Sequence, residues 1–290
     1  MHYTEAKALL SAGNGMNLYR GCSHGCIYCD SRSVCYGFTH EFEDIEVKGN
    51  APALLERALK SKRKKCMIGT GSMCDPYLPL ERELELTRRC LEIIDRYEFG
   101  VTILTKSDLI LRDMELLKSI HRHSKCVVQM TLTTYDDELC RIVEPNVCPT
   151  SRRFEALCRF RDEGIPTVVW LTPLLPWIND TAENLNGLLD YCEEAGVKGV
   201  VSFGMGLTLR DGSREYYYRA LDRHFPGLKE RYIRTYGSAY ELGSEHSAEL
   251  TALLRERCEN AGILWDQKQV FNYLREYESD CEQLSLLDGI

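Results

Sequence analysis

CSHGCIYC at residues 22–29 places three cysteines at Cys-x3-Cys-x2-Cys spacing, directly after a short segment, MNLYR at residues 16–20, that we predict to be a strand. Thiolate sulfur atoms at such close spacing are typical ligands of an iron–sulfur cluster. A [4Fe–4S] cluster needs four ligands, so three cysteines leave one iron open, and an open coordination position is typical of a reactive metal centre. Gly21 and Gly25 allow the tight backbone turn that this loop requires.

Downstream of this loop, short apolar runs alternate with segments of helical periodicity, which indicates about six strand–helix units. The further predicted strands are residues 66–69, 101–105, 126–134, 167–172 and 199–204. The predicted helices are residues 52–60, 80–97, 112–121, 152–163, 181–195 and 213–225. Strands of this kind are buried on both faces of a parallel sheet. The fold class is therefore α/β, either a barrel or a doubly wound sheet, with the chemistry expected at the carboxyl ends of the strands.

Residues 226–290 break this alternation. They contain a predicted helix near residues 247–260 and an aromatic tail. We therefore expect residues 1–225 to form the strand–helix domain and residues 226–290 to form an α-rich extension or cap that packs against it.

Composition narrows the class of protein. With 290 residues, 44% of them hydrophobic, the chain can build a real core, which excludes a disulfide-stapled miniprotein and a disordered tail. The formal net charge of −8 provides no overall attraction to nucleic acid or to an anionic membrane. Residues 1–15 lack the apolar core of a secretory signal, and the apolar residues 168–178 are too few to span a bilayer. We expect a cytoplasmic protein without membrane contact, in which the 14 cysteines stay reduced.

The cysteine loop resembles the defining motif of the radical S-adenosylmethionine (SAM) superfamily, which usually has an aromatic residue before its last cysteine. Tyr28 fills that position here. Further segments are similar to the spore photoproduct lyase-like group of that superfamily and extend over nearly the whole chain. They are residues 17–33 (NLYRGCSHGCIYCDSRS), 69–81 (GTGSMCDPYLPLE), 105–113 (TKSDLILRD), 144–146 (EPN) and 282–287 (EQLSLL).

This resemblance implies a partial (β/α)6 barrel and a [4Fe–4S] cluster on Cys22, Cys26 and Cys29. It implies that SAM binds the open iron, with Tyr28 near the adenine. One electron from the cluster would cleave SAM to a 5′-deoxyadenosyl radical, and this radical would abstract hydrogen from a substrate that the sequence does not identify. A low-potential electron donor such as flavodoxin or ferredoxin is implied as a partner.

The same resemblance assigns further residues to SAM. Ser72 and Asp75 follow the second strand in a glycine-rich turn and are expected near the amino group, and Lys106, after the third strand, is expected to pair with the carboxylate. Thr131 and Thr133 alternate along the predicted fourth strand, so both point to one face and are expected at the ribose hydroxyls. A simple turn, a solvated lysine and sheet packing are the structural alternatives for these positions.

One departure from the group concerns the hydrogen-atom donor. True spore photoproduct lyases have an extra cysteine after the second strand, and alignment on Asp75 places that position at Ser72. A serine O–H bond is too strong to give a hydrogen atom to a carbon radical. Cys74, two residues further on, is the candidate substitute, and the departure argues against thymine-dimer repair. Arg141 and Glu144 are expected on the substrate side without an assigned role.

Two alternatives remain open. In the first, Cys35 supplies a fourth thiolate and closes a non-catalytic zinc or iron–sulfur site. In the second, the chain is a nucleic-acid lesion repair lyase. Its phosphate contacts would come from the basic run at residues 60–65 (KSKRKK), Arg152 and Arg153, with the tyrosines at 216–218 stacking on bases. The basic run ends a predicted helix, where lysines favour the helix dipole, so nucleic acid is not the preferred substrate.

Overall fold

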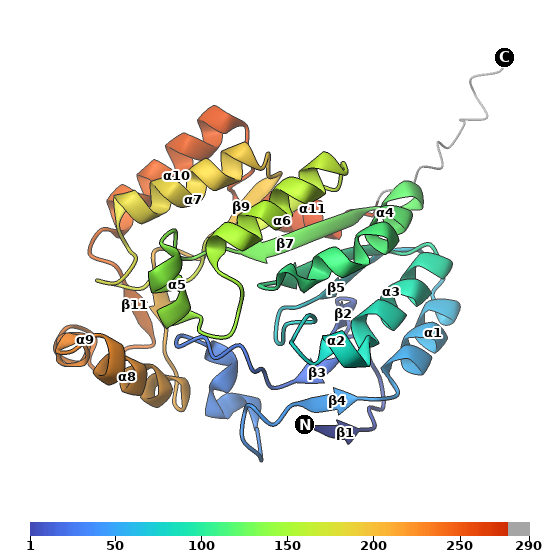
Figure 1. Ribbon diagram of the computed structural model, residues 1–290, viewed down its shortest axis with the longest axis horizontal. Coiled ribbons are helices and arrows are strands. Elements are labelled where there is room, and N and C mark those ends of the chain that lie inside the picture. Colours follow the sequence, from blue (N-terminus) through green and yellow to red (C-terminus); the bar gives the residue numbers. More distant parts are fainter. Residues whose placement is uncertain (278–290) are drawn as a thin grey trace.

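Six parallel strands form one sheet in which each strand is hydrogen-bonded to the next one along the chain (Figure 1). Their order in the computed structural model, which describes residues 1–277, is β2 (Gly15–Met16), β5 (Met67–Thr70), β6 (Gly100–Thr105), β7 (Cys126–Thr131), β8 (Thr167–Trp170) and β9 (Gly199–Val201). Within that part of the chain, β2 and β9 lie at the two edges and do not pair with each other, so the barrel is open on one side. The α/β class and the partial barrel of six parallel strands are confirmed.

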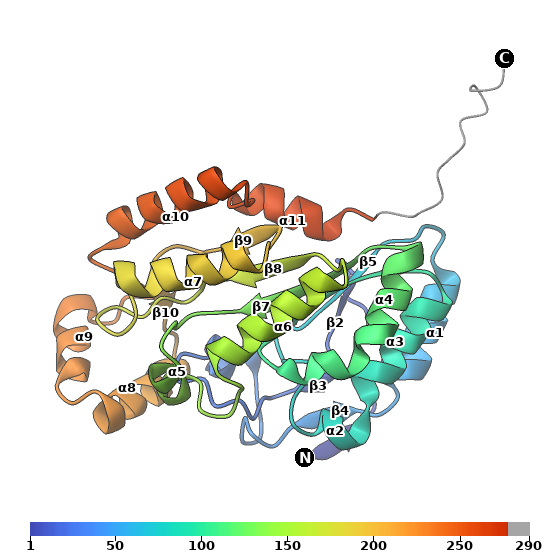
Figure 2. The ribbon, with the colours of Figure 1, turned by 45° about the horizontal axis from the view of Figure 1, so that its top comes forward.

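Helices cover the outer face of this sheet, as Figure 2 shows. They are α1 (Ala51–Ser61), α3 (Leu86–Arg96), α4 (Met114–His123), α6 (Thr150–Asp162) and α7 (Ala182–Glu194). All six residues of β6 and all six of β7 are buried, as expected for strands covered on both faces. On α3, Leu91 and Ile94 are buried at helical spacing, which explains why periodicity located this helix.

The predicted strand at residues 16–20 is divided between two sheets. Its first part, β2, pairs with β5, whereas β3 (Tyr19–Arg20) pairs with β4 (Glu46–Lys48) in a three-stranded sheet completed by β1 (His2–Thr4). The change of partner occurs at Leu18, whose carbonyl accepts a hydrogen bond from the backbone N–H of Lys48. The chain therefore leaves the barrel sheet immediately before the cysteine loop.

Other boundaries also differ from the predictions, among them the carboxyl ends of β8 and β9, at residues 170 and 201 instead of 172 and 204. The predicted helix 80–97 is divided into α2 (Glu81–Leu84) and α3 by Glu85, which has a left-handed φ of 48°. The buried carboxylate of Glu81 accepts the backbone N–H of Thr87, so it caps α3 from inside the fold. The 3-10 turn η3 (Asp108–Asp113) precedes α4, and β7 ends at Thr131 rather than at residue 134. The short helix α5 (Asp137–Val143) was not predicted.

The chain after residue 225 packs against several parts of the barrel. Helix α9 (Leu228–Tyr236) contacts α8 (Ser213–His224), α10 (Ser247–Ala261) contacts α7, and α11 (Gln267–Arg275) contacts β9. Strand β11 (Glu241–Gly243) forms an antiparallel hairpin with β10 (Gly206–Thr208), which precedes residue 225. The division at residue 225 remains a prediction, and residues 282–287 lie outside the described part of the chain. None of the described helices is long and apolar enough to cross a membrane.

Gly71, at the carboxyl end of β5, offers a direct test of this packing. Its φ is +100°, and a Cβ atom would lie 1.9 Å from the carbonyl oxygen of Leu104. We expect Gly71→Ala to lower the free energy of unfolding by about 2–4 kcal/mol, because backbone must move to accommodate the methyl group. Urea denaturation followed by circular dichroism measures this loss.

Gly13→Ala is the control, since a Cβ atom there meets nothing within 4 Å. Its effect on unfolding should stay within about 0.5 kcal/mol. Equal stability of the two variants would contradict the close contact between the ends of β5 and β6.

Candidate functional site

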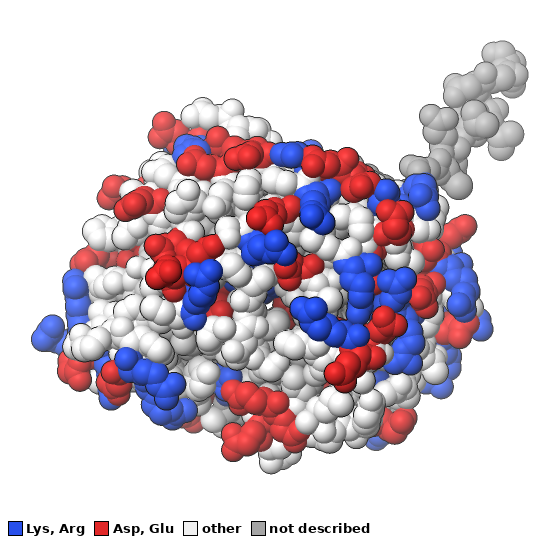
Figure 3. Space-filling view, viewed as in Figure 1, with Lys and Arg blue, Asp and Glu red and all other residues white. Residues whose placement is uncertain are grey.

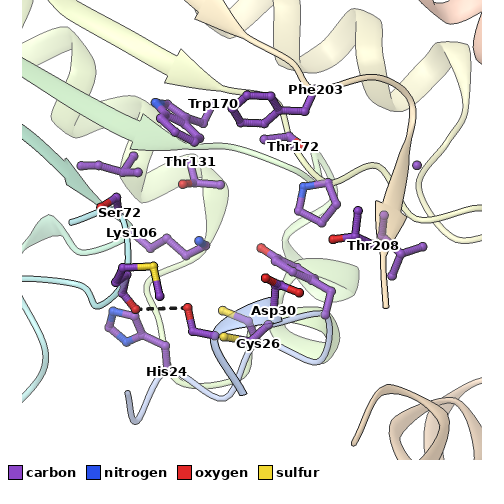
Figure 4. A pocket seen from close by; sticks show the side chains of 18 of the residues that line it. His24, Cys26, Asp30, Ser72, Lys106, Thr131, Trp170, Thr172, Phe203 and Thr208 are labelled. Atoms are coloured by element: carbon purple, nitrogen blue, oxygen red, sulfur yellow. Dashed lines mark hydrogen bonds between the residues drawn. The ribbon is translucent and has the colours of Figure 1, made fainter. Parts of the chain in front are cut away.

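A cavity of about 730 Å³ opens at the carboxyl ends of the parallel strands (Figure 4). Each strand from β5 to β9 supplies a residue at or just after its end. These residues are Gly71, Lys106, Thr131, Thr172 and Phe203. The position agrees with the rule that α/β barrels place their chemistry on the loops after the strands.

The three cysteines of the loop line this one cavity. Cys22, Cys26 and Cys29 are brought there by a turn in which the Cys29 N–H donates to the Cys26 carbonyl at 3.2 Å. Gly25 takes a φ of +71° in this turn, and a Cβ atom there would lie 3.0 Å from Asn146 Nδ2. Burial raises the pKa of the Cys22 thiol to about 12 and also raises the pKa of Cys26 and Cys29. Three soft sulfur donors therefore face one space, which fits the ligand set of an iron–sulfur cluster.

Cys35 lies outside this cavity. It is exposed on the 3-10 turn η2 (Val34–Tyr36), where its Sγ is 3.4 Å from the guanidinium of Arg210. A second 3-10 turn, η1 (Asp30–Arg32), lies between Cys29 and this position; Asp30, Ser31 and Tyr36 line the cavity, whereas Cys35 does not. The structure therefore does not bring the four cysteines of the closed-site alternative together.

Asp75 lines the cavity, and its carboxylate accepts three hydrogen bonds and faces the ring of His24. Oδ1 accepts from the Tyr77 N–H at 2.8 Å and from the Thr105 hydroxyl at 2.7 Å. Oδ2 accepts from the Lys106 backbone N–H at 2.7 Å and lies 3.0 Å from Nε2 of His24. Burial alone favours the neutral acid, but His24 and these donors outweigh it and lower the pKa of Asp75 to about 2. The side chain is a buried carboxylate anion that joins three segments of the chain.

The Lys106 ammonium is held inside the cavity near the ring of Tyr28, 5.9 Å from its centroid. Within residues 1–277 no hydrogen bond or ion pair engages its Nζ atom. Burial opposes the charge, but the nearby Cys26 and Glu144 outweigh burial and raise the pKa of Lys106. Lys106 is thus a charged donor that is free to bind an anion in the cavity.

The three predicted hydroxyl residues are placed differently. Ser72 and Thr131 line the cavity. Thr133 does not, because β7 has already ended and its alternation no longer applies. Thr133 is fully buried, and its carbonyl accepts from the amides of Asn179 and Asn184 at 2.8 and 3.0 Å.

Cys74 is buried at the edge of the cavity beside the cysteine loop. Its thiol donates to the carbonyl of Gly21 at 2.7 Å, directly before Cys22. Burial raises the pKa of this thiol well above its ordinary value, so it keeps its S–H bond.

The EPN segment, for which the sequence suggested no role, holds the cysteine loop in place. Its first residue, Glu144, is buried and accepts hydrogen bonds from the Tyr28 hydroxyl and from the Arg153 guanidinium. Its last residue, Asn146, donates from its backbone to the His24 carbonyl at 3.1 Å and from its side chain to the Ser23 carbonyl at 2.9 Å. The loop is thereby fixed at several points by a segment more than 100 residues away in sequence.

Arg153 connects the EPN segment, which holds the cysteine loop, to the sheet. It is fully buried, and it donates to the carbonyls of Thr131 at 2.7 Å and Cys148 at 2.9 Å besides Glu144. Burial alone favours the neutral acid of Glu144, but Arg153 and Lys106 lower its pKa. Arg153 is therefore a structural residue and cannot contact phosphate in solvent, contrary to the nucleic-acid alternative.

The opposite side of the cavity is apolar and was not predicted from the sequence. Trp170 and Phe203, whose ring centroids are 5.6 Å apart, lie at the ends of β8 and β9 (Figure 4). The β10–β11 hairpin completes this wall with Leu207 and Leu242, and it also brings the polar Thr208 and Glu241 to the cavity. The local sequence pattern does not predict this wall, because it forms only when the hairpin packs against the barrel.

The contribution of the ion pair between Glu144 and Arg153 to stability can be measured. We expect Arg153→Leu to lower the free energy of unfolding by about 3–5 kcal/mol, because it leaves the buried carboxylate of Glu144 without its charged partner. The neighbouring Arg152 is exposed and pairs with Asp108 and Glu155, so Arg152→Ala should cost less than about 1 kcal/mol. Chemical denaturation measures the free energy of unfolding of both variants. Equal losses would contradict a structural role of the buried Glu144–Arg153 pair.

Comparison with known proteins supports the resemblance seen in the sequence. A model of the radical SAM superfamily matches residues 16–189. An uncharacterized protein of Mycobacterium tuberculosis is 32% identical over 234 residues, which cover 76% of this chain and 66% of that protein. An uncharacterized protein of Methanocaldococcus jannaschii is 34% identical over 167 residues, covering 57% of this chain and 61% of that protein. This chain thus spans slightly less than two thirds of either relative's length.

A solved structure of spore photoproduct lyase complexed with dinucleoside spore photoproduct has a similar fold. Its TM-score is 0.65 at 14% identity, and the match covers 91% of this chain and 80% of that protein. At this identity the likeness concerns the fold alone. The family match covers more than half of the chain and includes the cysteine loop. The chain therefore belongs to the radical SAM superfamily, whose enzymes use a [4Fe–4S] cluster and SAM.

Proposed function

We propose that Cys22, Cys26 and Cys29 hold the [4Fe–4S] cluster and that the protein cleaves SAM reductively to abstract hydrogen from an organic substrate in the same cavity. The single observation that carries this proposal is that the three thiols line one cavity at the carboxyl ends of the strands while Cys35 lies outside it. When bound, the cluster and SAM supply a 5′-deoxyadenosyl radical. The chain itself has to position them, exclude water and present the substrate.

The residues around the cavity supply the contacts that SAM requires. Lys106 is a half-buried cation whose ammonium has no hydrogen bond or ion pair in the described chain, and it would hold the carboxylate. The ring of Tyr28 would lie against the adenine, and the hydroxyls of Ser72 and Thr131 would serve its polar groups. Thr133 does not line the cavity, so it has no role in SAM binding here.

Substrate would occupy the apolar side of the cavity. Trp170, Phe203 and Leu207 provide a largely hydrophobic wall there. Such a wall keeps water away from a carbon radical and favours an uncharged part of the substrate. The type of reaction beyond hydrogen abstraction, lyase or oxidoreductase, depends on that substrate.

Cys74 is the proposed hydrogen-atom donor. It retains its S–H bond at the edge of the cavity, whereas Ser72 offers only an O–H bond. Transfer of one hydrogen atom from Cys74 to a substrate carbon radical would form a C–H bond and leave a thiyl radical on sulfur.

Repair of nucleic acid is the alternative function that the sequence resemblance to the spore photoproduct lyase-like group raised. The proposed phosphate contacts do not support it. The basic run at 60–65 ends α1 and precedes the amino end of β5, whereas the cavity lies at the carboxyl ends of the strands. Of the three tyrosines at 216–218, the middle one, Tyr217, is fully buried. On the face seen in Figure 3, basic and acidic side chains are interspersed instead of forming a continuous basic surface.

The ligand assignment is tested by two cysteine variants. After anaerobic reconstitution and reduction with dithionite, the wild-type protein should contain the cluster and form 5′-deoxyadenosine from SAM. Cys26→Ala should lose both, because one of three ligands is gone. Cys35→Ala should keep both, because Cys35 faces Arg210 outside the cavity. Iron analysis and chromatography of 5′-deoxyadenosine provide the readouts, and loss of the cluster in Cys35→Ala would restore the closed-site alternative.

The proposed carboxylate contact is tested at Lys106. Lys106→Gln removes a charge-assisted hydrogen bond of about 1.5–3 kcal/mol, so the Kd for SAM should rise by about 10- to 100-fold while the iron content stays unchanged. Lys64→Gln, in the exposed loop before β5, is the matched control and should not change the Kd. Equilibrium binding to the reconstituted protein measures the effect, and an unchanged Kd in Lys106→Gln would refute the contact.

A further inference from the structure

We infer that Asp75 and His24 form a positioning pair that holds the cysteine loop in the shape the cluster requires, so that Asp75 acts through His24 and does not bind SAM. This inference rests on the proposed function, in that it takes the cysteines of this loop as the cluster ligands. It assigns a role to His24, which the sequence did not single out, and a different role to Asp75.

The first observation is the place of His24 in the loop. It lies between Cys22 and Cys26, its backbone N–H is 3.5 Å from Cys22 Sγ, and its carbonyl accepts from Asn146. Its Nε2 atom is 3.0 Å from Asp75 Oδ2, with side-chain exposures of 5% and 8% for the two residues. The ring thus faces, from the middle of the cysteine loop, a carboxylate that is held on the strand ends.

The second observation is that three protein donors already hold the Asp75 carboxylate. Oδ1 accepts from Tyr77 and Thr105, and Oδ2 accepts from Lys106, so the carboxylate is fixed on the ends of β5 and β6. A carboxylate oxygen accepts about two hydrogen bonds, so only Oδ2 has a position left. The ring of His24 lies 3.0 Å from Oδ2, and an amino group of SAM would have to compete with it there.

The third observation is the other ring nitrogen of His24. Neither Nδ1 nor Nε2 makes a hydrogen bond in the described protein; Nε2 has the Asp75 carboxylate at 3.0 Å, and His24 lines the cavity. A buried polar atom without a partner costs about 1–3 kcal/mol. Asp75 on one side of the ring therefore leaves Nδ1 available to a group bound beside the cysteines.

A double-mutant cycle tests the pair with readouts other than activity. Asp75→Asn, His24→Ala and the double variant are reconstituted, and iron retention against a chelator and the EPR spectrum of the reduced cluster are measured without SAM. Loss of outer partners of metal ligands typically lowers metal affinity by about 10- to 100-fold. We expect each single variant to lose at least about 10-fold in retention, and the double variant to lose no more than the worse single variant.

The surface pair His2–Asp44, 2.9 Å apart, provides the matched control, and Asp44→Asn should leave iron retention and the EPR spectrum unchanged. Circular dichroism of the metal-free variants verifies folding. If Asp75→Asn does not fold, His24→Ala alone decides, since it removes only the ring that faces the cavity.

Several results would overturn the inference. Full retention and a wild-type spectrum in His24→Ala would remove the positioning role. Independent, additive losses in the double variant would show that the two residues act separately. An intact cluster in Asp75→Asn together with a SAM Kd raised at least about 10-fold would make Asp75 a SAM ligand. Absence of a cluster from the wild type would instead refute the proposed function itself.

Discussion

The site depends on the attachment of the cysteine loop to the ends of the parallel strands. Two buried carboxylates provide it: Asp75 faces His24 inside the loop, and Glu144 accepts from Tyr28 and Arg153. Burial of a carboxylate is costly unless charged or hydrogen-bonding groups surround it, so each carboxylate requires its partners. The loop therefore has the conformation that satisfies these two anions, and the thiols take their positions from it.

The two sides of the cavity differ in the chemistry of their side chains. Sulfur atoms and the buried carboxylate of Asp75 lie on one side, and Lys106 is the one lysine or arginine that lines the cavity in the described chain. Trp170 and Phe203, with Leu207 and Leu242 of the β10–β11 hairpin, make the other side mainly apolar, and the hairpin adds Thr208 and Glu241. Under the proposed function, SAM would lie on the polar side and the substrate against the mainly apolar one.

Sequence patterns located most elements because burial repeats with a fixed period. The strands of the barrel and helices α1, α6 and α7 were predicted to within a few residues on this ground. Errors arose at individual long-range hydrogen bonds. At Leu18 the first predicted strand changes sheets, and at Glu81 a buried carboxylate caps α3. The early end of β7 similarly removed Thr133 from the cavity. Periodicity does not report such individual contacts.

The amino-acid sequence by itself determined the order of the barrel strands and of most helices that cover them, the place of the cysteine loop after the first strand, and the presence of three thiols on one short loop. It did so because these properties depend on spacing and burial over a few residues. The tertiary structure alone decided that Cys35 lies outside the cavity, that Thr133 is buried elsewhere, and that Asp75, Glu144 and Arg153 hold the loop. Tyr28 and Glu144 are 116 residues apart, and only the closing of the chain into a parallel sheet brings their side chains together.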